Sequence, residues 1–191
     1  MEPRIQYAQT SDGVSIAHWT LGNGKPLVYL PSPPWTHIQL EWQDPKCRRW
    51  YECLAENRML VRYDSRGSGL SERKVSDLSL DAHLRDLAAV VDRLRLERFA
   101  LFAGGHGGPV ATAYAAHHPE RVSHLILWCT YARVADYSRL PGVHAARELL
   151  RSNWRYYTEQ FAYAATGLSA ASWHVGWPRS SGRPWNRTWP R

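Results

Sequence analysis

The glycine-rich segment at residues 103–107 is the part of the sequence most directly tied to chemistry. It follows the apolar run 99–102 and precedes a helix-like segment that begins at Pro109. A sharp strand-to-helix turn of the form Gly-x-Ser-x-Gly presents a serine for attack on a carbonyl, because small residues two positions to either side let the backbone double back. The turn here consists of Ala103, Gly104, Gly105, His106 and Gly107. Gly105 stands at the serine position, where glycine avoids the strain of a left-handed backbone, so we predict the turn without its nucleophile.

Two other interpretations of this segment are weaker. A strand followed by clustered glycines and a helix also binds the phosphates of dinucleotides, but Val110 stands where that fingerprint needs its third glycine. His106 is an alternative nucleophile or metal ligand, yet no second ligand lies at a helpful spacing. A surface or pocket histidine is therefore favoured, and we predict no cofactor and no metal.

The elements that must position this turn alternate between strands and helices. Asp12-Gly13 supplies the positive φ angles of a tight turn, so the runs on either side of it are expected to form a hairpin. Alternation further along implies parallel strands joined by right-handed crossovers, which gives an α/β fold: a mostly parallel sheet with helices on both faces after an N-terminal hairpin. Strand character is found at 4–9, 14–21, 27–30, 59–63, 99–102 and 122–129, and helical character at 47–56, 80–94 behind Ser79, and 109–117.

The domain organisation is read from length and from changes in composition. A chain of 191 residues fits one domain, and we expect an α/β core at 1–134, the start of a helical lid at 135–165, and an irregular tail rich in Trp, Arg and Pro at 166–191. The tail contains four arginines and no acidic residue. We interpret it as the product of a reading-frame change after about Gly167. Stacking on nucleic-acid bases or binding to an anionic membrane is the weaker alternative.

Composition and charge bear on whether the chain binds nucleic acid, a membrane or a metal. The net charge is +7, but the tail carries much of it, so the body is only mildly basic and nucleic-acid binding is not demanded. No run approaches the roughly 18 apolar residues of a membrane-spanning helix, and the N-terminus lacks the basic and apolar regions of a secretory signal. The three cysteines match no zinc or redox spacing. We expect a cytoplasmic protein that binds neither a membrane nor nucleic acid.

Five segments together carry a family resemblance. They are residues 7–13, 37–42, 63–71 and 118–127 and the turn at 103–107. In this order and spacing the chain resembles the α/β-hydrolase superfamily over about residues 4–167, in particular its esterase, peroxidase-like and iminopeptidase-like branch, which includes modules fused to cyclases or transcription regulators. The resemblance implies the α/β-hydrolase fold, truncated before the last strands, and descent from a serine hydrolase of small ester- or amide-type substrates.

The resemblance also shows what is missing from a catalytic triad. No residue after Val122 can be matched to the family's acid or to its histidine. Asp136 and His144 are the nearest chemical types, but both fall in the segment expected to be a lid, so we interpret them as surface residues. The cluster that contains Asp64 and Arg66 looks reactive, yet the resemblance implies that this turn is mainly structural.

The resemblance further implies an oxyanion hole, which stabilises negative charge on a reacting carbonyl oxygen. Its donors are expected to be the backbone N–H of His106 and one N–H from residues 31–35. Prolines occupy positions 31, 33 and 34 and have no N–H, which leaves Ser32 or Trp35. The sequence does not decide between these two.

Two functions follow as expectations. The first is a derivative of a serine hydrolase that is inactive because its nucleophile position is Gly105 and its acid and histidine are missing. The second is a non-catalytic sensor module that binds a small-molecule ligand or a partner chain. A sheet that ends after the strand at 122–129 would also leave an exposed edge, through which self-association is expected.

Overall fold

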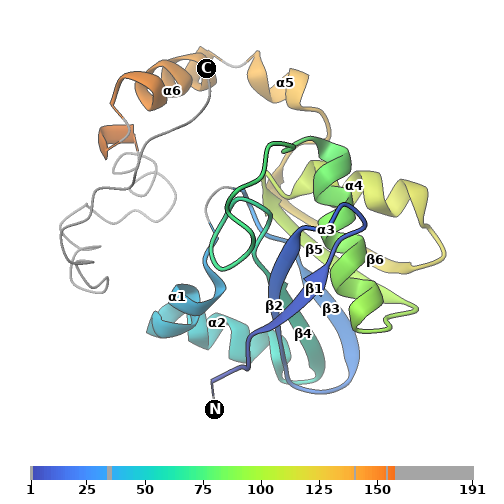
Figure 1. Cartoon of the computed structure of the whole chain (residues 1–191). Helices are drawn as coiled ribbons and strands as arrows, with labels where there is room; N and C mark the ends of the chain where they lie inside the picture. The colour runs from blue at the N-terminus through green and yellow to red at the C-terminus, as the bar shows by residue number, and fades with distance from the viewer. Residues whose placement is uncertain (1, 34–35, 140, 154, 158–191) are drawn as a thin grey trace. The chain divides into compact units, whose positions relative to one another are not determined.

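The structure is a computed structural model that describes residues 2–33, 36–139, 141–153 and 155–157. The chain divides into two units, residues 1–137 and 138–191, and the first contains the sheet. In chain order the elements are β1 (Gln6–Gln9), β2 (Ser15–Leu21), β3 (Lys25–Tyr29), α1 (Ile38–Gln43), α2 (Pro45–Ala55), β4 (Arg58–Tyr63), α3 (Leu80–Arg93), β5 (Phe99–Gly105), α4 (Gly108–His117), β6 (Val122–Thr130), α5 (Val134–Ser138) and α6 (Pro141–Ser152) (Figure 1).

The six strands form one mixed sheet in the order β1-β2-β4-β3-β5-β6. The predicted opening hairpin is confirmed, because β1 pairs antiparallel with β2 in a register that sets Ala8 opposite Ile16. β2 continues antiparallel to β4, and β4, β3, β5 and β6 are then parallel to one another. The strand order places β3 next to β5, so the chain segments that follow these two strands meet at one end of the sheet.

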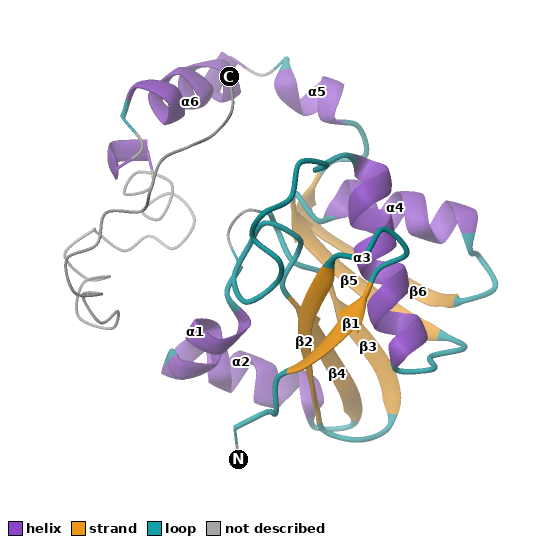
Figure 2. Ribbon diagram, viewed as in Figure 1, coloured by secondary structure: helices purple, strands orange, loops and turns teal. Residues whose placement is uncertain are grey.

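Helices lie on both faces of the sheet (Figure 2), because apolar side chains are found on both faces. Successive strand residues point to opposite faces, and adjacent pairs such as Leu60 and Val61 are both fully buried. Val61 belongs to the cluster that packs with α3 and α4, whereas Leu60 belongs to the cluster that packs with α1 and α2. The prediction of a sheet covered on both faces is therefore confirmed.

Helix α3 forms as the sequence indicates. The hydroxyl of Ser79 accepts a hydrogen bond from the backbone N–H of Ala82 at 3.2 Å, which caps the first turn. Asp81 lies in that turn, where the helix dipole favours negative charge, and Arg93 lies in the last turn. The apolar face of the helix is buried against the sheet through Leu87, Val90 and Val91.

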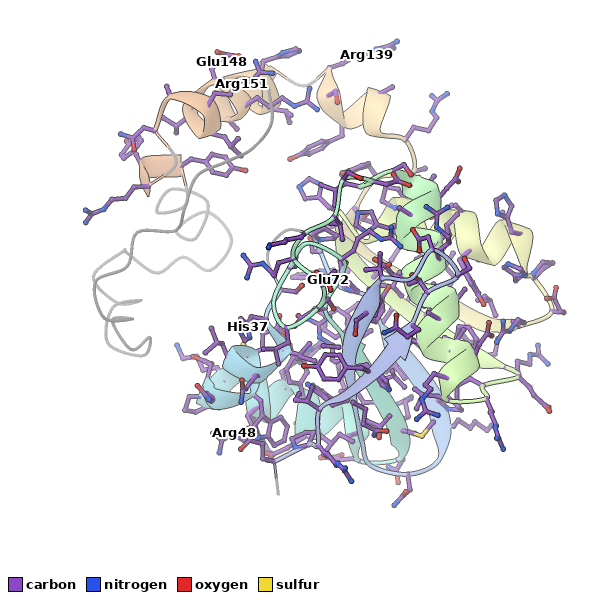
Figure 3. All side chains as sticks on the ribbon, in the orientation of Figure 1. His37, Arg48, Glu72, Arg139, Glu148 and Arg151 are labelled. Atoms are coloured by element: carbon purple, nitrogen blue, oxygen red, sulfur yellow. The ribbon has the colours of Figure 1, made fainter. Side chains whose placement is uncertain are left out.

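Helix α1 has no counterpart in the sequence prediction. The preceding residue, His37 (labelled in Figure 3), caps it: its ring Nδ1 accepts a hydrogen bond from the N–H of Leu40 at 3.4 Å. Glu41 returns a bond by accepting from the N–H of His37, also at 3.4 Å. Histidine is not among the residues usually found at this position, so the start of the helix has little local signal.

The outer strand β6 has an unusual surface. Leu125, Ile126, Leu127 and Trp128 are 37%, 48%, 46% and 64% exposed, although they follow one another along the strand. Because consecutive residues face opposite sides, exposure of all four means that apolar side chains on both faces of this stretch are partly open to solvent within the described structure. In the part of the chain that the structure describes, no helix is long and apolar enough to span a bilayer.

Candidate active site

The turn at residues 103–107 lies between β5 and α4. β5 extends to Gly105, three residues further than the apolar run predicts, and α4 begins at Gly108. Gly105 has φ +52°, in the left-handed region that glycine enters freely and that a serine would occupy only at a cost on the order of 1–3 kcal/mol. The vertex therefore has the backbone of a sharp strand-to-helix turn, with hydrogen in place of a side chain.

Close backbone contacts hold this turn against the loop after β3. A Cβ atom at Gly107 would lie 2.6 Å from the carbonyl oxygen of Pro31, which is too close for any residue but glycine. The N–H of Gly107 donates to the carbonyl of Gly104 at 3.0 Å. From β6, the hydroxyl of Thr130 donates to the carbonyl of Gly105 at 2.5 Å. The turn is thus fixed from both neighbouring strands.

Ser32 contacts the turn with its side chain. The backbone N–H of His106 donates to Ser32 Oγ at 3.1 Å, so this N–H already has an acceptor within the chain. Ser32 was predicted only as a possible backbone N–H donor, whereas in the structure its side-chain oxygen is an acceptor. The other candidate donor, Trp35, lies outside the described residues.

His106 is half-buried and its ring is engaged. Its Nδ1 lies 2.5 Å from the hydroxyl of Tyr131, and the two share a hydrogen bond. The ring also makes edge-on contacts with Tyr131 and Tyr137, at centroid distances of 5.7 and 5.5 Å. Burial lowers the pKa of His106 below its ordinary value of 6.5. The neutral imidazole is therefore favoured.

The two residues nearest in type to a triad acid and base lie beyond β6. Asp136 belongs to α5, and its side chain is outside what the structure describes. His144 lies in α6, in the second unit, and is exposed. Among the described residues, no group of three or more His, Cys, Asp and Glu side chains is arranged to hold a metal ion.

The turn that contains Asp64 and Arg66 joins several elements. The buried carboxylate of Asp64 accepts from the backbone N–H groups of Ile38 at 3.0 Å and Leu70 at 2.9 Å. Burial raises the pKa of this carboxyl. These contacts tie the turn to the start of α1.

Arg66 does not pair with Asp64. Its guanidinium is buried between Asp86 of α3 and Asp12 of the hairpin turn, with a distance of 2.8 Å to each carboxylate. The hydrogen bond from Arg66 is the main reason that the pKa of Asp12 lies well below its usual range. Arg66 therefore connects three parts of the chain, a structural role.

A second buried charge cluster lies on the other face of the sheet and was missed by sequence reasoning. Arg62 of β4 pairs with Glu41 of α1 at 2.7 Å, and its guanidinium lies 4.4 Å from the ring centroid of Tyr29. The hydroxyl of Tyr51 donates to the same carboxylate oxygen at 2.5 Å. An arginine inside an apolar strand was the available signal, but its partner is 21 positions away.

A hollow of about 460 Å³ lies away from the turn, between β1 and α3. Its walls include Tyr7 and Gln9 from β1 and Arg85 and Arg93 from α3. None of the residues at 103–107 lines it. The turn around Gly105 is instead in contact with Ser32, Pro31 and Thr130.

Comparison with known proteins supplies the context for this geometry. A family model described as alpha/beta hydrolase fold matches residues 44–183, which extends past Gly167 into the Trp/Arg-rich tail. The chain is 29% identical over 137 residues to the AB hydrolase superfamily protein YisY of Bacillus subtilis. The aligned region covers 71% of this chain and 48% of YisY. It is 31% identical over 110 residues to a proline iminopeptidase of Xylella fastidiosa. This alignment covers 55% of this chain and 32% of that protein.

Among solved structures, Cfl2 from Burkholderia cenocepacia aligns with a TM-score of 0.63 at 23% identity. The alignment covers 83% of this chain and 58% of Cfl2. At that identity the likeness concerns the fold. The chain spans less than half the length of the curated relatives described above.

Proposed function

Since this chain belongs to the α/β-hydrolase fold family, we propose that it is a non-catalytic member, derived from a serine hydrolase of small ester- or amide-type substrates. The observation that carries the proposal is Gly105 at the vertex of the strand-to-helix turn, with φ +52° and no side chain to attack a carbonyl. A serine hydrolase without its serine loses several orders of magnitude in rate.

The surroundings of the vertex support the same conclusion. A triad histidine needs a free nitrogen facing the nucleophile and an acid on its other nitrogen. The ring beside the vertex belongs to His106, and its Nδ1 bonds to the phenol of Tyr131 instead of a carboxylate. The amide of His106, the expected oxyanion donor, is engaged by Ser32. Among the described residues, the vertex, the ring beside it and the adjacent amide are therefore all unsuited to acyl transfer.

Hydrolysis of p-nitrophenyl acetate by the purified chain tests the proposal. We expect a rate equal to that of buffer that contains the heat-unfolded protein, and no side chain labelled by a fluorophosphonate. A rate well above this background that is abolished in His106→Ala would contradict the proposal. Stoichiometric labelling of one serine, mapped by mass spectrometry, would contradict it as well.

A second candidate function is partner binding through the edge of the sheet. Strand β6 is an edge strand in the described structure, and Leu125 to Trp128 are exposed on both of its faces. Natural edge strands are guarded by charges, prolines or short length. Residues 122–130 contain no Lys, Arg, Asp, Glu or Pro, so a second copy of the chain can pair along this strand without opposing charges. Concentration-dependent sedimentation tests this, with a monomer at all concentrations as the contrary result.

A further inference from the structure

The hydroxyl of Ser32 lies where a working vertex would need open space. A Cβ atom built on Gly105 would be 2.8 Å from Ser32 Oγ and 3.8 Å from Ser32 Cβ. The first distance is far shorter than van der Waals contact, whereas the second is ordinary. It is the oxygen of Ser32, and not its carbon, that fills the space above the vertex.

The same oxygen also accepts a hydrogen bond from the amide beside the vertex. Ser32 Oγ accepts from the N–H of His106 at 3.1 Å, within the normal range of an N–H···O hydrogen bond. The Ser32 hydroxyl therefore fills the volume that a side chain at position 105 would need. It also accepts the hydrogen bond that the His106 amide would otherwise donate to a ligand oxygen. Both facts follow from one position of Ser32 Oγ, so a single rotation of this side chain would end both contacts.

We infer that Ser32 is a gate on this site: its side chain closes the turn, and a vertex side chain or a carbonyl or carboxylate oxygen reaches the His106 amide only when Ser32 turns away. The inference rests on the proposed function in one respect, because it concerns the same turn. The inference adds a second obstacle at the site, the Ser32 side chain, which is separate from the missing serine at position 105. A side chain restored at position 105 would therefore have to displace the Ser32 hydroxyl from this place.

The fold explains why Ser32 is held in this place. β3 and β5 are parallel neighbours, with Tyr29 opposite Phe102, and the ladder continues through the bond from the N–H of Leu30 to the carbonyl of Phe102 at 2.8 Å. The carbonyl of Pro31 then packs against Gly107. The backbone on both sides of the contact is fixed by the sheet, which leaves rotation of the Ser32 side chain as the simplest way to open the site.

A double-mutant cycle tests the steric part of the inference. Gly105→Ala is made in the natural chain and in Ser32→Ala, and urea unfolding is measured for all four proteins. The strain of φ +52° is the same in both backgrounds and cancels in the comparison. We expect Gly105→Ala to reduce the folding equilibrium constant at least about fivefold more when Ser32 is present, since the oxygen must then give up its hydrogen bond. Equal reductions in the two backgrounds would overturn the inference.

Amide hydrogen exchange tests the hydrogen bond without any change at Gly105. In Ser32→Ala we expect the N–H of His106 to exchange about fivefold faster than in the natural chain. Ser123→Ala is the matched control, because Ser123 lies on β6 and its hydroxyl faces the ring of His124 at 3.3 Å. An unchanged exchange rate in Ser32→Ala, or an equal acceleration in both variants, overturns the inference. Both tests measure stability or exchange and not turnover, so either this inference or the proposed function can fail alone.

Discussion

The imidazole of His106 is hydrogen-bonded to the phenol of Tyr131, with 2.5 Å between Nδ1 and the hydroxyl oxygen. In a serine hydrolase triad the corresponding bond runs from the histidine to a carboxylate, which fixes the tautomer and stabilises the imidazolium that forms when serine gives up its proton. A phenol cannot supply that charge. The pairing thus makes His106 part of an aromatic contact with Tyr131 and Tyr137, without the carboxylate partner of a triad histidine.

Restoring the vertex serine is expected to fail. Gly105→Ser supplies a hydroxyl, but under the proposed function the chain holds no base to activate it, so hydrolysis of p-nitrophenyl acetate should stay at background, both in the single variant and in Gly105→Ser with Ser32→Ala. The rate is measured together with active-site titration, which would detect a stoichiometric burst of p-nitrophenol. A burst in either variant, mapped to position 105, would show that another group of this chain acts as the base.

The stability of the fold is expected to fall as the pH drops below about 6.5. Burial lowers the pKa of His18, opposed in part by the backbone of Ile16, and burial also lowers the pKa of His106. In each case the unfolded chain binds a proton at a higher pH than the folded chain does. The contribution is therefore fully present above pH 6.5 and is lost as the pH falls towards the lowered pKa, at up to about 1.4 kcal/mol per pH unit for each histidine.

His18→Leu isolates one of these two histidines. His18 is completely buried, and among the described residues neither of its ring nitrogens makes a hydrogen bond of good geometry, although the nearby backbone of Ile16 partly favours its protonated form. Removing the unpaired polar ring should raise the free energy of unfolding at pH 7 by about 1 kcal/mol and flatten its decline between pH 6.5 and 5.5. Urea unfolding at several pH values measures both effects. An unchanged slope in His18→Leu would show that this ring titrates normally in the folded chain.

Local patterns were sufficient to predict most of the elements but not the contacts at the site. The helix α3 was recognisable from its apolar spacing and its Ser79 cap, and the hairpin from Asp12-Gly13, because these signals lie within a few residues. Gly105 was recognisable as the vertex because its neighbours in sequence define the turn. The contact between Ser32 and His106 joins positions 74 apart, and it exists only because β3 and β5 pair side by side.

The same distance in sequence hid the buried charges. Glu41 and Arg62 lie in different elements, and no local sequence pattern near either residue predicts that the two form an ion pair. Arg66 was expected in a structural turn, yet its two carboxylate partners come from the hairpin and from α3. Pairing of this kind is set by the tertiary fold, and residue type alone gives only the expectation that a buried charge must be paired.

Arg66→Ala is expected to be strongly destabilising. It leaves Asp86, which is as deeply buried as Arg66, with only the ring of His83, at 3.5 Å, as a side-chain partner in the described structure, and loss of one member of a buried pair typically costs about 3–5 kcal/mol. The matched control is Arg151→Ala, because Arg151 and Glu148 form an exposed pair at 2.9 Å on α6 (Figure 3) and such pairs contribute less than about 1 kcal/mol. Urea unfolding compares the two variants. Equal losses would mean that Asp86 finds another partner or water when Arg66 is removed.

A lysine on the outer strand is expected to suppress self-association. Ile126 lies at the centre of the exposed apolar stretch of β6, and a second copy that paired antiparallel about this residue would bring the two Ile126 side chains together. Ile126→Lys places two positive charges at that point, which is how natural edge strands prevent pairing. Sedimentation velocity over a range of concentrations should therefore show less dimer for Ile126→Lys. Leu80→Lys, an equivalent change at an exposed leucine of α3, should leave the dimer unchanged, and equal effects of the two lysines would rule out β6 as the interface.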